Sequence, residues 1–154
     1  MKMEKSNYKK FGVILMISFI LMYVIMFLNV DDVDHIYINM TRFYMTLLMI
    51  SAMAILMVVM MPMMYSNKNI NTAIITSGVV VFILAFAGVH TQTGISDIQY
   101  MKGMIPHHSI AIMTSKNAHI KDARVRKLAD NIIKTQEKEI AEMKAMIDSL
   151  KNNR

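Results

Sequence analysis

Two adjacent histidines and three methionines gather in one short stretch of the chain, YMKGMIPHHSIAIM at residues 100–113. If the stretch forms one helix, Met101, Met104 and His108 lie on a single face, which Asp97 shares one turn earlier. Thioether sulfur favours Cu(I), and imidazole nitrogen suits both copper and zinc. The spacing therefore predicts a copper site with these candidate ligands: Met101, Met104, His107, His108 and Met113.

A structural interpretation of the same residues stays open. Methionine at helical spacing commonly fills gaps in a core, because its side chain is flexible. A single histidine near the start of a helix is also commonly structural or exposed. An adjacent histidine pair flanked by three methionines is harder to explain in this way. Metal binding and core packing therefore both remain as hypotheses for this stretch.

A second polar feature lies further along the chain, within an apolar stripe whose steps alternate between three and four residues. The stripe consists of Ala129, Ile133, Gln136, Ile140, Met143, Ile147 and Leu150. A buried amide is costly without a partner, so Gln136 could hold the N–H of a ligating imidazole from the preceding helix. Glu139, beside it, could do the same or bind a metal directly. The alternative is that Gln136 sets the register of a helical bundle, as buried Asn does in coiled coils.

The composition predicts a membrane protein. The chain has 154 residues, of which 55% are hydrophobic, 18% charged and 19 Met, with no Cys and a net charge of +6. Soluble domains carry about a quarter charged residues, and disorder needs low hydrophobicity. Without Cys, disulfides, thiolate zinc sites, cysteine nucleophiles and iron–sulfur clusters are excluded. A copper site made of His and Met suits an oxidising compartment, where thiols tend to be lost to disulfides.

Three uncharged runs predict three transmembrane helices over about 11–30, 43–64 and 71–89, since a bilayer core needs about 20 apolar residues as helix. Pro62 falls in the last turns of the second run, where a kink is tolerated. The first run is too long for a signal peptide and lacks a cleavage site, so we interpret it as an anchor. The chain thus divides into a membrane domain, 1–90, and an external helical domain, 91–154.

Charge predicts the orientation of these helices. The N-terminal tail carries four Lys and one Glu, the loop at 31–42 carries Asp31, Asp32 and Asp34, and the loop at 65–70 carries Lys68. We expect a bacterial inner membrane protein with a cytoplasmic N-terminus and a periplasmic or extracellular C-terminal domain. We interpret the acidic loop and its His35 as solvated, with loose attraction of cations as the alternative.

The C-terminal domain is predicted to be a helical hairpin. Ser96 is expected to cap a helix over about 97–116, with Gln99 completing a capping box and Pro106 bending or restarting the helix. After a turn at 117–121, Asp122 is expected to cap a helix of about 28 residues that ends near Leu150. Two such helices cannot bury a sufficient core, so we predict that hairpins pair into a four-helix bundle and that the protein is a homo-oligomer.

The chain here resembles a known family. The residues that carry the resemblance are Asp97, Tyr100, Met101, MIPHH at 104–108, AIM at 111–113, Leu128-Ala129, Ile132-Ile133, Gln136, Glu139-Ile140 and Met143. Over about 96–150 they are similar to domain-of-unknown-function family 305. The resemblance implies a ferritin-like helical bundle, and copper or silver binding as in some periplasmic or exported members. It implies these ligands: Met101, Met104, His107, His108, Met113 and Met143.

The chain departs from that family in two ways. Typical members are longer, or are exported without several membrane spans, whereas this chain has three uncharged runs. Ser109 and Ile110 stand where polar residues or Gly are common after the histidine pair. A di-iron enzyme is not expected, because such sites need Glu-x-x-His motifs from two helices and none occurs. The Glu residues of the tail all lie in one predicted helix: Glu137, Glu139 and Glu142.

The sequence therefore predicts a non-enzymatic, membrane-anchored metal-binding protein. No phosphate-binding loop or hydrolase motif is present, and the basic residues of the tail alternate with acids, as on a solvated helix face rather than a nucleic-acid surface. We expect Cu(I), and by similarity Ag(I), to be captured, buffered or passed to a partner protein, with Gln136, Glu139 and Asp97 supporting the ligands. The alternative is a structural or interaction membrane protein whose helical domain serves oligomerisation or partner docking.

Methionines also follow the second uncharged run at regular spacing. Met45, Met49, Met53 and Met57 repeat every four residues, and Met60, Met61, Met63 and Met64 follow them. A soft-metal path through the bilayer is one interpretation. Transport paths usually contain buried polar or ionisable residues as well, and these runs hold only scattered Ser and Thr. We therefore interpret the stripe as packing.

Overall fold

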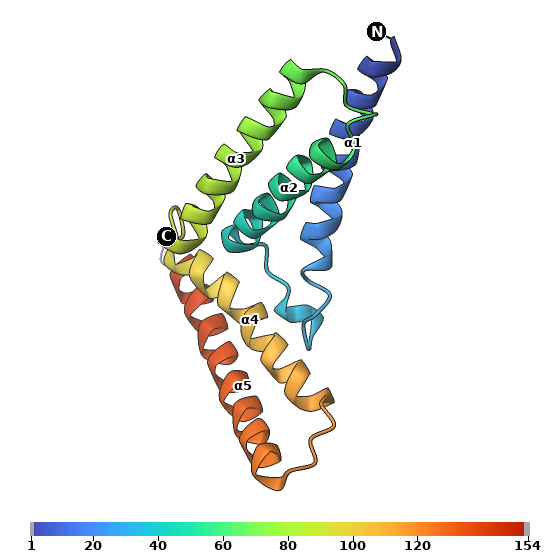
Figure 1. The fold of residues 1–154 in the computed structure, drawn as a ribbon. Helices are drawn as coiled ribbons and strands as arrows, with labels where there is room; N and C mark the ends of the chain where they lie inside the picture. The colour runs from blue at the N-terminus through green and yellow to red at the C-terminus, as the bar shows by residue number, and fades with distance from the viewer. Residues whose placement is uncertain (1, 153–154) are drawn as a thin grey trace. The chain divides into compact units, whose positions relative to one another are not determined.

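The computed structural model describes residues 2–152 and consists of helices joined by short connections (Figure 1). The helices are α1 (Lys2–Ile25), the 3-10 helix η1 (Val33–His35), α2 (Met40–Met60), α3 (Lys68–Thr91), α4 (Asp97–Asn117) and α5 (Ala123–Asn152). No strand occurs in this described range. Three segments are long and apolar enough to cross a membrane: Ser6–Ile25, Met40–Met60 and Lys68–Thr91. The predicted all-α class with three candidate spans is confirmed.

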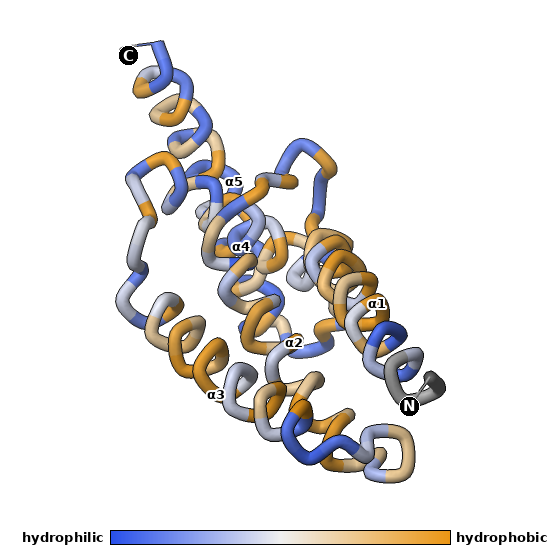
Figure 2. Tube along the Cα trace, turned by 90° about the horizontal axis from the view of Figure 1, so that it is seen from above, coloured by the Kyte–Doolittle hydropathy of each residue, from blue (hydrophilic) through white to orange (hydrophobic). Residues whose placement is uncertain are grey.

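The chain folds as two compact units. The membrane unit contains nearly all of α1, together with α2 and α3. The hairpin unit contains α4, α5 and the connection between α1 and α2, including η1. Figure 2 shows that apolar residues predominate along α1 and α3, whereas polar residues are mixed with them in α5. The unexpected feature is the α1–α2 connection, because it packs with the C-terminal hairpin.

Two helices of the membrane unit end earlier than the uncharged runs predict. α1 ends at Ile25 rather than near residue 30, and a turn follows before the Asn and Asp residues of the connection, which favour turns. α2 ends at Met60, so Pro62 lies beyond the helix and not in its last turns. Proline lacks an N–H and disfavours helical geometry at the residue before it. The helix predicted over 43–64 therefore ends at Met60, about four residues earlier than expected.

Small residues allow α2 and α3 to approach closely. A Cβ atom added at Gly78 would lie 2.9 Å from Cγ1 of Ile55, and one added at Gly88 would lie 3.2 Å from the ring of Tyr44. Close backbone approach at glycine is a common way for helices to associate in membranes. The hydroxyl of Tyr44 also donates a hydrogen bond of 2.8 Å to the carbonyl of Thr93. α2 and α3 are thus fixed against each other by packing and one terminal hydrogen bond.

The two helices of the hairpin unit begin at the predicted caps. The hydroxyl of Ser96 accepts a bond from the backbone N–H of Gln99, and Asp122 accepts bonds from the N–H groups of Arg124 and Val125. Only one of the two hydrogen bonds of the predicted capping box forms. The return bond between the side chain of Gln99 and the backbone of Ser96 is missing, because the Gln99 side-chain oxygen is buried and has no hydrogen-bond partner among the described residues. That side chain turns inward instead of back toward the cap. α4 runs through Pro106 as one helix.

The hairpin core forms along the predicted stripe. Its buried members from α4 and α5 are Met101, Ile105, Ile112, Ile140, Met143 and Ile147. Ile133 packs against this cluster, and Ala129 is also buried. Leu150 departs from the prediction, since it stays 39% exposed. With 30 residues against 21 in α4, α5 is the longer helix of the hairpin, so its last turn extends past the start of α4.

Candidate metal centre

The centre of the candidate site is His108 on α4. Its Nδ1 atom lies 3.1 Å from Oε2 of Glu139 on α5, and the imidazole side chain is only 13% exposed. The direction between the two atoms is not that of an aligned hydrogen bond, so the contact is a close electrostatic one. Sequence reasoning left the imidazole partner open between Gln136 and Glu139. In the structure Glu139 touches the ring, while Gln136 is half-buried in the stripe.

The surroundings of His108 favour its neutral form. Burial lowers the pKa of this imidazole below its ordinary value of 6.5, and the neighbouring His107 lowers it further, while the charge of Glu139 opposes both effects. A neutral imidazole is the form that binds metal ions. With Nδ1 facing a carboxylate, the remaining ring nitrogen, Nε2, is the one that a metal ion could take as a ligand. The same carboxylate–histidine arrangement fixes the ligating ring in many metal sites.

The methionines predicted as ligands fall into two environments. Met101 and Met143 are buried in the hairpin core, 6% and 8% exposed, and Met104 packs against that cluster from its edge. Met113 is half-buried further along α4. The α4–α5 interface therefore brings together three thioethers from both helices, on the helix pair that also holds His108.

Two of the predicted residues lie on the surface. The ring of His107 is exposed, and its centroid is 6.1 Å from that of His108 with 62° between the planes. Asp97 is exposed at the start of α4. Within the described residues, no group of three or more His, Asp or Glu side chains could hold a metal ion. A metal in this unit would therefore need thioether ligands beside imidazole.

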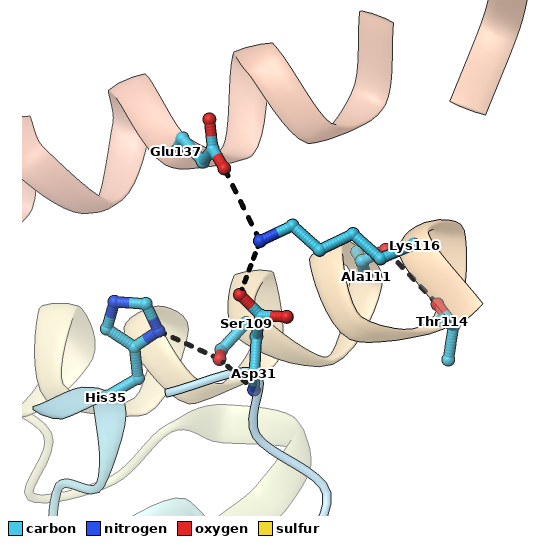
Figure 3. A network of polar contacts seen from close by, with 7 residues as sticks. All are labelled: Asp31, His35, Ser109, Ala111, Thr114, Lys116 and Glu137. Carbon is cyan, nitrogen blue, oxygen red and sulfur yellow. Dashed lines mark hydrogen bonds and ion pairs between the residues drawn. The ribbon is translucent and has the colours of Figure 1, made fainter. Parts of the chain in front are cut away.

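The connection between α1 and α2 contacts α4 next to this site. We call residues 31–35 the strap. The hydroxyl of Ser109 accepts a hydrogen bond of 2.7 Å from the backbone N–H of Asp31, and Nδ1 of His35 lies 2.9 Å from the same oxygen (Figure 3). Ser109 is completely buried. The strap therefore contacts the hairpin through the backbone of Asp31 and the ring of His35. Its three aspartates stay exposed, as expected for a solvated acidic loop.

Ion pairs hold both ends of the strap. Nζ of Lys116 lies 2.8 Å from Asp31 and 3.6 Å from Glu137 of α5, as Figure 3 shows, and Lys144 pairs with Asp34. The hydrogen bond with Lys144 lowers the pKa of Asp34, and the bond with Asp31 raises the pKa of Lys116. These partners lie 85 and 110 residues apart in the sequence. No local pattern predicts such pairs, which is why sequence reasoning missed the strap.

The position of His35 in the strap lowers the pKa of its imidazole and so favours the neutral form. Burial lowers its pKa below 6.5, the positive charge of Lys144 lowers it further, and the strap aspartates oppose both effects. A neutral Nδ1 can accept the proton of the Ser109 hydroxyl, whose oxygen already accepts from the backbone of Asp31. The buried hydroxyl of Ser109 thus has a partner both as an acceptor and as a donor.

The described residues form an all-helical protein with three membrane-length helices and a helical hairpin. The core between α4 and α5 contains Met101 and Met143, and His108 lies on the same helix pair. The family model described as Domain of unknown function (DUF305) matches residues 86–153. An uncharacterized protein of Acanthamoeba polyphaga mimivirus is 37% identical over 124 residues, which cover 79% of each chain. The chain belongs to the DUF305 family. No solved structure matches it.

The similarity to the viral protein covers more than the hairpin unit. The family match spans 68 residues (153 − 86 + 1), whereas the aligned region of the viral protein spans 124. The similarity therefore extends into the membrane-length helices. The predicted family is confirmed, with a match that begins in α3, earlier than the start of the resemblance near residue 96.

Proposed function

We propose that this protein binds a soft monovalent metal ion, Cu(I) and by similarity Ag(I), and acts in metal capture, buffering or resistance without catalytic turnover. The observation that carries the proposal is His108, whose imidazole is 13% exposed and whose Nδ1 faces Glu139. It lies on the same helix pair whose core contains Met101 and Met143. An imidazole nitrogen and neutral thioethers are the ligands that Cu(I) accepts in the absence of thiolates.

The exposure of the ligands suggests an order of contact with the ion. His107 is exposed, Met104 and His108 are half-buried, and Met101 and Met143 are buried. The exposed residues would bind the ion first, and the core between α4 and α5 would then shield it from water and oxidants. Met113, Gln136 and Asp97 remain candidates for supporting roles on the same two helices.

Location and partners belong to the same proposal. The charge pattern supports a cytoplasmic N-terminus and an external hairpin in a bacterial inner membrane. Apolar side chains stay exposed on the hairpin at Leu128, Val125 and Met146. Such residues support pairing of hairpins into a four-helix bundle, or docking of a protein that receives the metal.

A second candidate function rests on that same apolar surface. The hairpin would then be an oligomerisation or docking module of a structural membrane protein, and the methionines of the hairpin core would only pack. The two functions differ in what His108 does, because a docking module has no need for a neutral imidazole with one nitrogen available.

The test is a Cu(I) competition titration of the full chain in detergent micelles against a chromogenic chelator. We expect submicromolar binding, with Kd below about 1 μM, and the loss of one bound Cu(I) ion in His108→Ala. His119→Ala is the matched control, since His119 is exposed in the turn between α4 and α5. Binding that is equal in both variants would exclude a site centred on His108 and favour the docking module.

A further inference from the structure

Four methionines surround a proline in the membrane unit, at the end of α2 and directly after it. They are Met60, Met61, Met63 and Met64, and we call residues 60–64 the methionine turn. Their side chains are 69%, 40%, 98% and 39% exposed. Methionine that serves as core filler is buried among apolar neighbours. These four instead lie at the surface of the membrane unit, as do Met45 and Met49 of α2, which are 38% and 37% exposed.

The backbone of this segment is a hydrogen-bonded turn. The N–H of Met64 donates to the carbonyl of Met61 at 3.0 Å, and the N–H of Tyr65 donates to the same carbonyl at 3.2 Å. Pro62 occupies the second position of the turn, where its fixed φ is favourable. A turn of this kind brings the first and fourth Cα atoms within about 7 Å. Met61 and Met64 therefore start from neighbouring backbone positions.

The turn is anchored on both sides. Tyr65 is 3% exposed, and its ring lies 5.5 Å from that of Phe11 in the apolar cluster of the membrane unit. The side-chain amide of Asn7 donates to the carbonyl of Met64 at 3.1 Å, and that of Asn71 donates to the carbonyl of Tyr65 at 2.7 Å. The backbone is thus fixed while the thioethers are exposed. Fixing the backbone beforehand reduces the entropy cost of binding a ligand.

Bilayer contact alone does not account for this clustering. α3 has the same membrane-length character over 24 residues and contains no methionine. Its exposed positions carry Val, Ile, Leu and Phe instead. α2 is itself rich in methionine, with six in 21 residues, but four within five positions of the turn is a higher density than in either helix.

The surrounding charges restrict which ion could bind here. The sequence of the membrane unit holds a single carboxylate, Glu4, so hard divalent cations such as Ca²⁺ and Mg²⁺ would find few of the carboxylate ligands that they usually take. Neutral thioethers are soft ligands that favour Cu(I). A monovalent soft ion also leaves less uncompensated charge beside the basic residue Lys68.

We propose that the methionine turn binds one soft monovalent cation, Cu(I) or Ag(I), between Met61 and Met64, with Met60 or Met63 as a further ligand. The site lies in the membrane unit and uses neither His108 nor any other residue of the hairpin. It can therefore exist whether or not the hairpin binds metal.

The test counts Ag(I) ions bound per full-length chain in detergent micelles, because Ag(I) is stable in air. The variant Met61→Leu/Met63→Leu/Met64→Leu removes three thioethers while nearly conserving volume and hydropathy. The matched control, Met45→Leu/Met49→Leu/Met53→Leu, removes three from within α2. We expect the turn variant to lose one bound ion, or to bind it at least about tenfold more weakly. The α2 control and His108→Ala should both keep that ion.

A second measurement works on the unchanged sequence. Ag(I) added to protein labelled at the methionine methyl groups should shift the NMR signals assigned to the turn, with assignments taken from single Met→Leu variants. Thioethers carry no proton that competes with metal, so these shifts should be unchanged between about pH 5 and 8. Equal loss of Ag(I) in the turn variant and the α2 control, or turn signals that ignore Ag(I), would overturn the proposal. Loss in His108→Ala alone would leave the hairpin as the only site.

Discussion

The hairpin unit and the membrane unit use the same unusual residue in opposite ways. In the hairpin, Met101 and Met143 are buried in the core of a helix pair that also carries the contact between His108 and Glu139. In the membrane unit, the methionine turn is exposed, and residues 35–96 contain no carboxylate. A count of 19 methionines therefore describes no single function. What matters is whether a thioether is buried and which polar groups lie near it.

The two units are also stabilised by different interactions. The hairpin unit combines an apolar core with ion pairs to the strap, through Lys116 and Lys144. The membrane unit relies on close packing at Gly78 and Gly88 and on uncharged hydrogen bonds such as the 2.7 Å bond from Tyr8 to Asn71. Changes to core volume, charge and pH should accordingly affect the two units differently.

The largest expected effect comes from a cavity in the hairpin core. Ile112 is completely buried, so Ile112→Ala should destabilise this unit by about 2–5 kcal/mol. Amide hydrogen exchange of α5 in the full chain measures the change. Leu84→Ala in α3 is the control, because Leu84 is 65% exposed and its removal leaves no cavity. Equal acceleration of α5 exchange in both variants would mean that the hairpin core does not stabilise α5.

The sequence predicted the elements of both units well, because each is encoded locally. Uncharged runs located three spans, and Ser96 and Asp122 marked the starts of α4 and α5. The errors were also local, since the effect of Pro62 on the end of α2 was underestimated. Burial of Met143 followed from its place in the apolar stripe, whereas burial of Met101 fits the core-packing interpretation that the sequence left open.

The strap was not predictable in the same way. Its contacts join Asp31 to Lys116 and Asp34 to Lys144, and many other Lys residues of the tail were equally available as partners. Ser109 looked like a departure from the family pattern, yet its hydroxyl is the buried acceptor for the strap backbone. Such long-range choices depend on tertiary packing and leave no periodic pattern in the sequence.

Glu139→Gln tests whether charge matters for metal binding in the hairpin unit and not in the membrane unit. The amide keeps the size of the side chain but removes the charge that faces Nδ1 of His108. If Glu139 orients the ligating ring, Cu(I) affinity of the full chain should fall roughly 10–100-fold in the chelator titration. Ag(I) binding at the methionine turn should not change, because that turn belongs to the other unit. A similar decrease at both sites would indicate a general loss of folding.

Acidification should loosen the strap and leave the membrane unit unchanged. The pKa of His35 is lowered from 6.5, so the folded strap binds a proton less readily than the unfolded chain. Its contribution to stability is then complete above about pH 6.5 and is lost as pH falls below that value toward the folded pKa. Because the chain has no Cys, a spin label at Val33→Cys, a 79% exposed position, reports on the strap alone.

We expect the label to become more mobile between about pH 7 and pH 5. Three kinds of group face His35: Ser109 from α4, Lys144 from α5 and the aspartates of the strap itself. The variant His35→Gln keeps a polar side chain near Ser109 but cannot titrate in this range. An unchanged pH response in His35→Gln would assign the transition to another group.

The smallest effect is expected at Lys116, which is 42% exposed and bridges Asp31 to Glu137. Exposed ion pairs contribute about 0–1 kcal/mol, so Lys116→Met should increase label mobility at Val33→Cys only slightly. Ser109→Ala should increase it more, because it removes the buried hydroxyl that contacts both the N–H of Asp31 and Nδ1 of His35, a loss of about 1–3 kcal/mol. The reverse order would mean that charge, not the buried hydroxyl, holds the strap. In that case about 1 M salt, which screens charges beyond about 3 Å, should release the strap of the unchanged chain as well.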